Sequence, residues 1–227
     1  QANQPSKKKT KRVIERPLMN DWQAWQLYPH HSWNFNKLEL SLKLGYNCGP
    51  AGVPVNKTGK YIIRPIYNLE GMGLNARIEH IEKDKVHYIK PGQFWCEVFD
   101  GDQISIDYKW NKGKLVAIHA SQGYNSNNNL TEFFRWIKID PPNIKLPKFI
   151  NEFDDVDHIN IEFINDKIIE IHLRHGADFP PGATEIIPVW NDKKEEMKEK
   201  YNDWFYKEDF EDCEGHLKNP RLGFYYR

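Results

Sequence analysis

The sequence predicts an α+β fold in which strands outnumber helices. Several runs alternate apolar and polar residues with the period of a half-buried strand, most clearly residues 159–174. Turn signals separate other candidate strands, as at Asp100-Gly101 and Asn111-Lys112-Gly113. Helical patterns are few, which makes a mixed, strand-rich class the best description.

The composition indicates a folded chain with a substantial core. Hydrophobic residues make up 39% of the 227 residues and aromatic residues 14%, which is enough for one domain or for two small lobes around a cleft. Lys and Arg number 32, as do Asp and Glu, so the formal net charge is zero. The global charge therefore indicates no polyanionic partner, and nucleic acid is not expected as a ligand.

The cysteines and the hydropathy pattern suggest a cytoplasmic protein. Three cysteines, Cys48, Cys96 and Cys213, are widely spaced and form no paired motif, which argues against a disulfide framework and a zinc site. No apolar run approaches the roughly 18 residues that span a bilayer. The polar start of the chain lacks the apolar region of a secretory signal.

The first 34 residues divide into a basic tail and an aromatic segment. The tail, residues 1–16, contains the run Lys7-Lys8-Lys9-Thr10-Lys11-Arg12. We interpret it as a solvated terminus, and an electrostatic tether to nucleic acid is the alternative. The aromatic residues between Met19 and Trp33 are expected to anchor this segment onto the core.

The next elements are expected in a small lobe, residues 35–92. Residues 36–46 predict a short helix that stops at Gly45, although partial alternation leaves a strand as the alternative. A turn follows at 49–52, and the run 61–63 predicts a buried strand.

A larger lobe, residues 93–190, is expected to begin with a β-meander. Its strands are predicted at 94–99, 103–110 and 114–120, with a hairpin at Asp100-Gly101. Residues 121–147 contain an Asn-rich loop and a Pro-rich stretch, and a further hairpin is expected to end at residue 174. Residues 191–227 are predicted to be a helical tail, with a charged helix at 193–201.

The hairpin within 159–174, INIEFINDKIIEIHLR, has the strictest alternation in the chain. Its odd positions Ile159, Ile161, Phe163, Ile169, Ile171 and Leu173 are apolar, and its polar even positions are Asn160, Glu162, Glu170, His172 and Arg174. A two-residue turn at Asn165-Asp166 would place Glu162 and Glu170 on opposite faces and split the apolar set. We therefore expect a three-residue turn that includes Lys167, which pairs Glu162 with Glu170.

This pairing has a chemical consequence. Carboxylates directly opposite each other on antiparallel strands have Cβ atoms about 5 Å apart, and such like charges repel. A divalent cation between them removes the repulsion, and Mg²⁺ typically binds carboxylates together with phosphate oxygens. The alternative is an exposed polar strand face with hydrated charges.

The hairpin resembles the metal-binding hairpin of the ATP-grasp superfamily, in which two Glu and an Asn bind magnesium and an Arg lies near the transferred phosphate. The resemblance places Glu162, Glu170 and His172 on Mg²⁺ or Mn²⁺, with His172 where Asn is usual, and Arg174 at the catalytic Arg. Imidazole suits Mn²⁺ better than Mg²⁺. The segment between the glutamates is also shorter than in many members of the superfamily.

Three upstream motifs resemble the same superfamily in the same order. Asn36-Lys37 before the helix is similar to its start motif, whose Lys approaches ATP, and Arg64 stands at its phosphate-binding basic position. The segment WCEVFDGDQISIDY is similar to its hinge, which puts residues beside adenine and ribose. The resemblance implies this set of ATP-binding residues: Lys37, Arg64, Asn68, Gly71, Met72, Gly73, Glu97, Val98, Phe99 and Gln103.

The resemblance, which covers residues 36–190, implies two α/β lobes on antiparallel sheets with ATP between them. It also implies an ATP-dependent carboxylate–amine ligase in a minimal form that lacks most of the N-terminal domain. ATP, a carboxylate substrate and an amine acceptor are then the expected ligands, and a protein partner could supply the acceptor site. A non-catalytic nucleotide-binding module of a larger assembly is the alternative, as is a nucleic-acid-associated protein that uses the basic tail.

Overall fold

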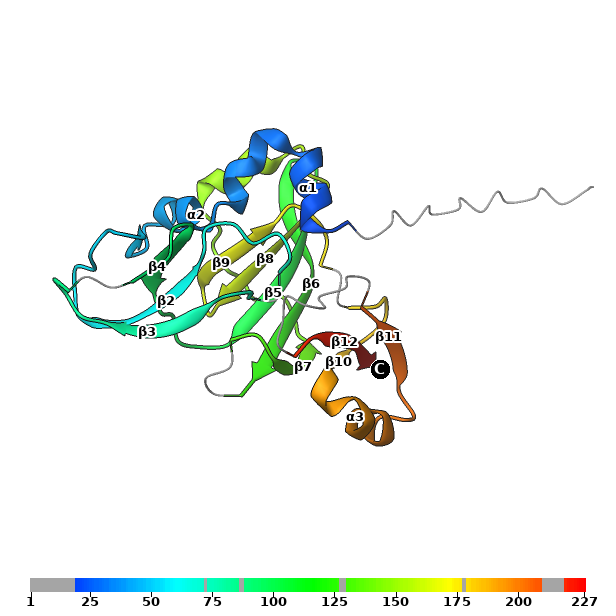
Figure 1. The fold of residues 1–227 in the computed structure, drawn as a ribbon. Coiled ribbons are helices and arrows are strands. Elements are labelled where there is room, and N and C mark those ends of the chain that lie inside the picture. Colours follow the sequence, from blue (N-terminus) through cyan, green and yellow to red (C-terminus); the bar gives the residue numbers. More distant parts are fainter. Residues whose placement is uncertain (1–18, 72, 86–87, 127–129, 177–178, 210–218) are drawn as a thin grey trace, which may run out of the picture.

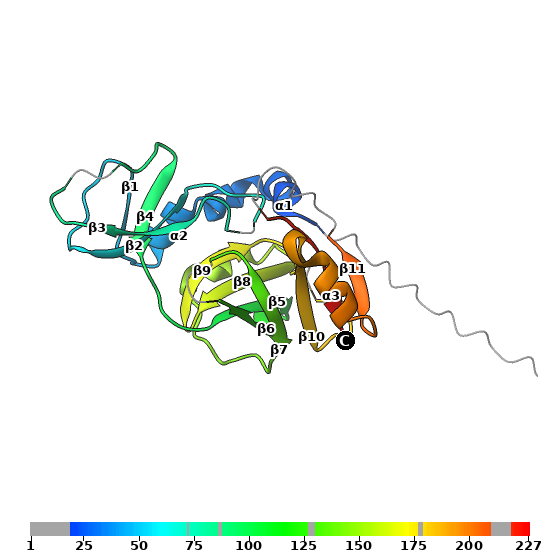
Figure 2. The ribbon, with the colours of Figure 1, turned by 60° about the horizontal axis from the view of Figure 1, so that its bottom comes forward.

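The computed structural model describes residues 19–71, 73–85, 88–126, 130–176, 179–209 and 219–227, and within them the strands form two antiparallel sheets (Figures 1 and 2). The small sheet has the order β1 (Cys48–Pro50), β4 (Gln93–Glu97), β2 (Gly59–Pro65), β3 (Arg77–Ile81). The large sheet has the order β11 (Phe205–Glu208), β12 (Arg221–Tyr226), β10 (Glu185–Trp190), β7 (Phe133–Lys138), β6 (Lys114–Asn125), β5 (Gln103–Asn111), β8 (His158–Ile164), β9 (Lys167–His172). The predicted α+β class with two antiparallel sheets is confirmed.

Three consecutive helical segments run along the β9 side of the large sheet, and they are α1 (Asp21–Leu27), the 3₁₀ helix η1 (Pro29–Phe35) and α2 (Lys37–Lys43). The side chain of Asn20 caps α1 by accepting a hydrogen bond from the backbone N–H of Gln23 at 2.9 Å, and the Gln23 side chain caps the Asn20 N–H in return. Asn36 caps α2 in the same way through the N–H of Glu39. The helix predicted over 36–46 is thus confirmed.

The main core lies between these helical segments and the large sheet. It contains side chains from β5, β8 and β9, such as Ile106, Phe163 and Ile171, together with Leu40 of α2 and Phe153 of the 3₁₀ helix η2 (Lys148–Phe153). The rings of Trp25, Tyr28 and Trp33 pack against this cluster. The aromatic segment therefore anchors the start of the described chain, as predicted.

Two smaller clusters complete the packing. Tyr61, Ile63 and Trp95 lie in the core of the small sheet. At the other end of the molecule, the 3₁₀ turn η3 (Asn191–Lys193) leads into α3 (Lys194–Lys200), which packs on β10. The charged helix predicted over 193–201 corresponds to α3, but residues 205–208 and 221–226 are strands of the large sheet rather than a helical tail.

The predicted β-meander is wrong at its first hairpin. Strand β4 pairs with β1 and β2 in the small sheet and not with β5. Residues 98–102 instead carry the chain from one sheet to the other, after the boundary expected at residue 92. The predicted strands β5 and β6 do pair with each other, whereas β7 lies in a region that was expected to be loop.

The turn of the β8–β9 hairpin also differs from the prediction. Glu162 lies opposite Glu170 as predicted, but Ile164 pairs with Lys167, so the turn contains only Asn165-Asp166. A bulge between Glu162 and Phe163 restores the register. As a consequence Ile168 joins the core, while Ile169, expected in the core, lines the cavity described below.

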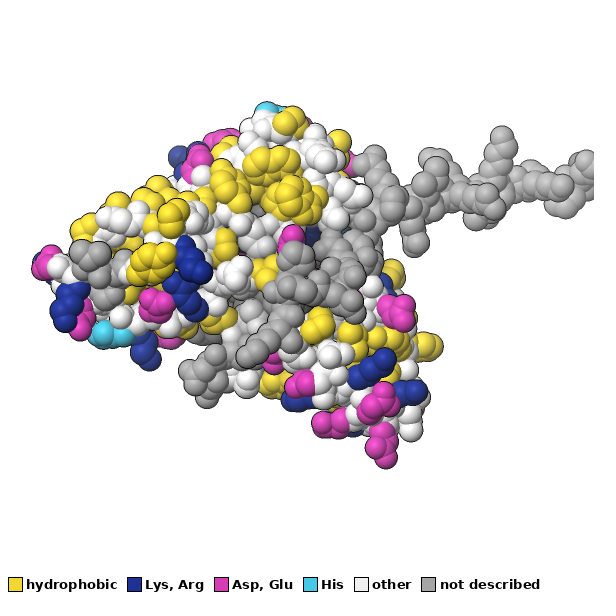
Figure 3. Space-filling view, viewed as in Figure 1, with side chains coloured by type: hydrophobic (Ala, Val, Ile, Leu, Met, Phe, Trp, Pro, Cys, Tyr) yellow, Lys and Arg dark blue, Asp and Glu magenta, His cyan; other side chains and the backbone are white. Residues whose placement is uncertain are grey.

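Hydrophobic side chains gather on the face over α1 in the space-filling view (Figure 3). Trp22 and Leu27 of α1 are 51% and 57% exposed, and Tyr67 is 51% exposed. No helix among the described residues is long and apolar enough to cross a membrane.

Candidate active site

A cavity of about 290 Å³ lies between the two sheets. Residues of β2 and the loop that follows it form one wall, and residues of β5, β8 and β9 form the other. The volume is close to the lower limit for pockets that bind small molecules. Sequence-predicted residues on the cavity wall are Lys37, Arg64, Asn68, Gly71, Gly73, Gln103, Glu162, Glu170, His172 and Arg174.

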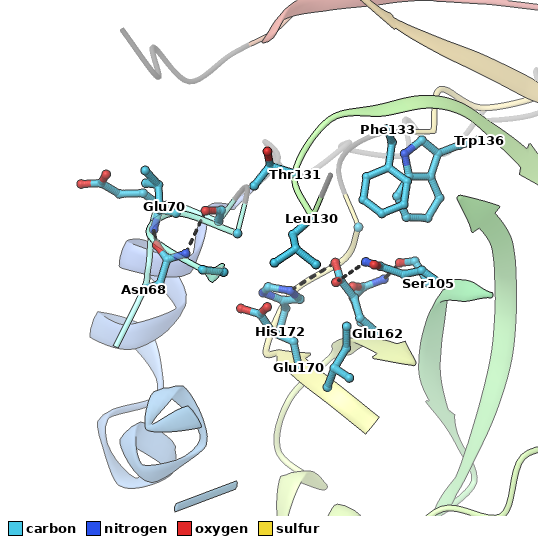
Figure 4. Close-up of a pocket in the computed structure, with 18 of the residues that line it drawn as sticks. Asn68, Glu70, Ser105, Leu130, Thr131, Phe133, Trp136, Glu162, Glu170 and His172 are labelled. Atoms are coloured by element: carbon cyan, nitrogen blue, oxygen red, sulfur yellow. Dashed lines mark hydrogen bonds and ion pairs between the residues drawn. The ribbon is translucent and has the colours of Figure 1, made fainter. Parts of the chain in front are cut away.

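The two glutamates and His172 converge at the floor of this cavity (Figure 4). Glu162 and Glu170 are register partners across β8 and β9, and His172 follows Glu170 by two residues on the same strand. One ligand atom from each of the three side chains lies within 4.8 Å of the others. The His172 Nε2 atom is 3.7 Å from Glu162 Oε1.

Two cations, the buried Lys37 and the half-buried Arg64, lie beside these carboxylates. The Nζ atom of Lys37, the first residue of α2, forms an ion pair with Glu170 Oε1, and the lysine is 5% exposed. Arg64 on β2 donates from Nη2 to the carbonyl of Ile169 at 3.0 Å. Its Nε atom is buried and has no hydrogen-bond partner within the described part of the chain. A buried donor without an acceptor is costly, so Arg64 is well placed to bind an anion in the cavity.

Asp21 is a site residue that sequence reasoning missed. This carboxylate, the first residue of α1, is 3% exposed. It lies 2.8 Å from His172 Nδ1, and it accepts hydrogen bonds from Arg174 at 2.8 Å from Nε and 3.3 Å from Nη2. Asp21 therefore orients His172 and Arg174, which follow Glu170 in the chain. The capping pattern Asn20-Asp21-x-Gln23 indicates a helix start there, but nothing local in the sequence links Asp21 to residues 151 positions away.

The charges at this end of the cavity are strongly coupled. Burial raises the pKa of Asp21, but His172 and Arg174 outweigh it and hold that pKa well below its usual range. Burial lowers the pKa of His172, yet the Asp21 carboxylate reverses the effect and the net shift is upward. Burial and then the Arg64 charge lower the pKa of Lys37, while the nearby carboxylates oppose that shift.

The donor set fits a divalent cation. Two carboxylates and one imidazole at mutual distances below 4.8 Å provide oxygen and nitrogen ligands on one side of the ion and leave the other side open to the cavity. In the arrangement seen here, Lys37 and His172 are the positively charged neighbours of the carboxylates. A cation ligated by Nε2 of His172 must displace the proton that the raised pKa favours.

The sequence-predicted residues Asn68, Gly71 and Gly73 belong to the loop after β2, here called the glycine loop. It lies across the cavity from the carboxylates, and Figure 4 labels its residue Asn68. Gly71 and Gly73 have positive φ angles of 73° and 61°, a region that glycine adopts more readily than residues with a Cβ atom. The side chain of Asn68 closes the loop by donating to the carbonyl of Gly71 at 2.8 Å. Met72 lies outside the described residues.

The hinge residues differ in their placement. Gln103, at the start of β5, lines the cavity and donates to Glu162 Oε2 at 3.1 Å. Glu97, Val98 and Phe99 are absent from the cavity wall. The Glu97 carboxylate accepts from the backbone N–H of Asn47 at 2.8 Å, and the Phe99 ring packs on Tyr46. The structure thus brings the carboxylates, Lys37, Arg64 and the glycine loop together, and it leaves these three hinge residues outside.

The cavity also has a wall that the sequence did not reveal. Its polar residues come from β5, β6 and β8, and its aromatic residues include Phe133 and Trp136 of β7 (Figure 4). His119 Nε2 lies on this wall, is buried and has no hydrogen-bond partner in the described chain. The alternation of β6 places His119 and Ser121 on one face, which is the only local signal for this wall.

The known proteins that resemble this chain are found among solved structures. No protein-family model matches the sequence, and no curated protein matches it. Among solved structures, the chain is similar to N5-carboxyaminoimidazole synthetase from Staphylococcus aureus complexed with ADP, with 12% identity, coverage of 88% of this chain and 68% of that chain, and a TM-score of 0.52. It is also similar to carboxyaminoimidazole ribonucleotide synthase from Aspergillus clavatus complexed with ATP, with 10% identity, coverage of 89% and 69%, and a TM-score of 0.52.

These similarities, together with the two sheets around the carboxylate cavity, show that the chain has the ATP-grasp fold. The chain spans between 43% and 69% of the lengths of eight of the solved structures that it matches.

Proposed function

We propose that this chain is an ATP-dependent ligase that activates a carboxylate as an acyl phosphate for attack by an amine or a similar nucleophile. The observation that carries this proposal is the convergence of Glu162, Glu170 and His172 in one cavity with the glycine loop and Arg64. The Nε atom of Arg64 has no hydrogen-bond partner among the residues that the structure describes. Carboxylates for a metal and cations for phosphates thus share one cavity.

In this scheme the residues of the chain bind and orient the reactants. Glu162, Glu170 and His172 hold the metal, while Arg64 and Lys37 bind phosphate oxygens. A bound Mg²⁺ or Mn²⁺ supplies neutralisation of the negative charge on the phosphates. The glycine loop offers backbone N–H groups that approach the phosphates without interference from a Cβ atom.

Two bonds are exchanged in the proposed reaction. The substrate carboxylate attacks the terminal phosphorus of ATP, the bond to the bridging oxygen breaks, and ADP leaves. The nucleophile then attacks the acyl carbon, the carbon–oxygen bond to the phosphate breaks, and its electron pair leaves on inorganic phosphate. The proton that the nucleophile loses passes to solvent. Arg174, held by Asp21 at 2.8 Å, is positioned to stabilise the charge on the acyl phosphate and its transition state.

The test measures ADP release with a panel of carboxylates and amines, for the wild-type chain and for Glu170→Gln. We expect the variant to keep its fold, as judged by circular dichroism, and to lose turnover. Glu195→Gln is the matched control, because Glu195 is exposed on α3 and does not line the cavity. Undiminished ADP release by Glu170→Gln would refute the assignment.

A non-catalytic nucleotide-binding module is the second candidate. The observation in its favour is that Asp21 contacts both His172 and Arg174. These contacts restrict the movement of the two side chains during a reaction. Calorimetric binding of ATP without ADP release across the whole panel would support this candidate over the ligase. The same panel therefore separates the two functions.

A further inference from the structure

A second group of metal-ligating side chains lies outside the cavity and consists of His30, His31 and Asp155. The Nε2 atom of His30 is 2.8 Å from Asp155 Oδ2, and the Nε2 atom of His31 is 2.7 Å from Asp155 Oδ1. One ligand atom from each residue lies within 4.8 Å of the other two. None of the three residues lines the cavity between the sheets.

We propose that His30, His31 and Asp155 form a zinc site that fastens the N-terminal helical segments to the large sheet. Two imidazole nitrogens and one carboxylate oxygen are a common ligand set for Zn²⁺, and water completes the tetrahedral coordination. The two Nε2 atoms already converge on one carboxylate. Zinc bound by the two Nε2 atoms and by Asp155 would replace these two hydrogen bonds, and each neutral imidazole would then carry its proton on Nδ1.

The surroundings hold the site in place. His31 is 6% exposed, and its ring packs edge-on against the buried ring of Phe153 with 5.0 Å between ring centroids. Trp33 stacks on the same phenylalanine at 5.5 Å. The side chains of His30 and Asp155 are 58% and 45% exposed, so the ion and its water reach the site from solvent.

The position of the proposed zinc site indicates which part of the fold it would stabilise. The histidines belong to η1, whereas Asp155 follows η2, and the two are separated by 124 residues of chain. The three ligands come together only in the folded chain, so the free energy of zinc binding adds to the free energy of unfolding. The segment that is fastened begins with α1, which carries Asp21, and η1 is also bonded to β9 because Asn34 donates to the carbonyl of Ile171 at 2.7 Å. Zinc at this site therefore stabilises the element that positions His172 and Arg174.

The test uses Glu170→Gln as the background, because this substitution weakens the other metal-ligating cluster. After treatment with EDTA, the chain is titrated with Zn²⁺ in competition with a chromophoric chelator, and Co²⁺ absorbance reports the coordination geometry. We expect one tetrahedral site per chain. His30→Ala and Asp155→Asn should weaken zinc binding by at least about tenfold, because loss of a ligand exceeds the effect of losing an outer-shell partner.

His80→Ala is the matched control, since His80 is an exposed histidine on β3 and lies outside both clusters. Hydrogen exchange supplies a second measurement that does not depend on activity. Zinc should increase amide protection over residues 21–35 in the background chain and in His80→Ala, but not in His30→Ala. Equal zinc affinity in His30→Ala, Asp155→Asn and His80→Ala, or protection that does not change with zinc, would overturn the proposal.

Discussion

The buried Asp21 carboxylate offers the sharpest test of the site, through the substitution Asp21→Asn. The change keeps the shape of the side chain and removes the charge that faces His172 and Arg174. Removing one partner from a buried ion pair costs about 3–5 kcal/mol, because the remaining charges are left uncompensated. For a chain of this length each kcal/mol shifts the Tm by about 2–4 °C, so the expected loss is about 6–20 °C.

The pH dependence of the free energy of unfolding gives an independent test of the Asp21 carboxylate. The pKa of Asp21 in the folded chain lies far below its ordinary value of 3.8. Its contribution to the free energy of unfolding is therefore fully present at neutral pH and is lost as the pH falls below that ordinary value. Wild-type stability should fall with acidification in this range, and the Asp21→Asn curve should be flatter there.

Urea denaturation at several pH values measures both effects. Asp84→Asn is the matched control, because Asp84 is exposed and has a φ angle of 64°, which asparagine tolerates. Surface substitutions usually change the free energy of unfolding by no more than about 0.5 kcal/mol. If the free energy of unfolding of Asp21→Asn lies within this range of the control, the coupling between α1 and β9 is refuted.

Three further substitutions test other parts of the structure. Arg64→Met should weaken the binding of an ATP analogue by at least about tenfold in calorimetry, because it removes the guanidinium whose Nε atom has no hydrogen-bond partner within the described residues. An unchanged affinity would exclude Arg64 from phosphate binding. Gly101→Ala should destabilise the chain by about 1–3 kcal/mol in urea denaturation, since an added Cβ would lie 2.1 Å from the Asn165 side chain and φ is 133°; no loss would mean that this contact relaxes freely. Phe153→Ala should lower the free energy of unfolding by about 3–5 kcal/mol in the same assay, because the Phe153 ring is fully buried between the helical segments and the sheet. A loss below about 1 kcal/mol would contradict that packing.

The carboxylate pair was predictable because its geometry depends on the parity of the strand register. A three-residue turn and a two-residue turn with a bulge both place Glu162 opposite Glu170, so alternation identified the pair without identifying the turn. The same ambiguity explains Ile169. The bulge moves this side chain from the core face to the cavity, and no residue between Glu162 and Glu170 signals where the extra residue is inserted.

The parts of the fold that were missed depend on long-range packing. Strand β10 contains Pro188, a residue that argues against a central strand, yet β10 lies between β7 and β12. Strand β4 pairs across the sequence with β1 and β2, while the adjacent Asp100-Gly101 suggested a hairpin with β5. In both places local turn and strand signals were outweighed by contacts that sequence patterns do not encode.

The order of strands at the end of the large sheet bears on how the protein is made. Strand β12 lies between β10 and β11, and Arg221 on β12 belongs to the cavity wall together with Trp190 on β10. Domains fold as the chain leaves the ribosome, from the N-terminal side onward. A nascent chain must therefore expose the unpaired edge of β10 until residue 226 has emerged, and such an edge is a site for aggregation. Reporter tags and truncations near this strand will affect solubility and ligand binding together.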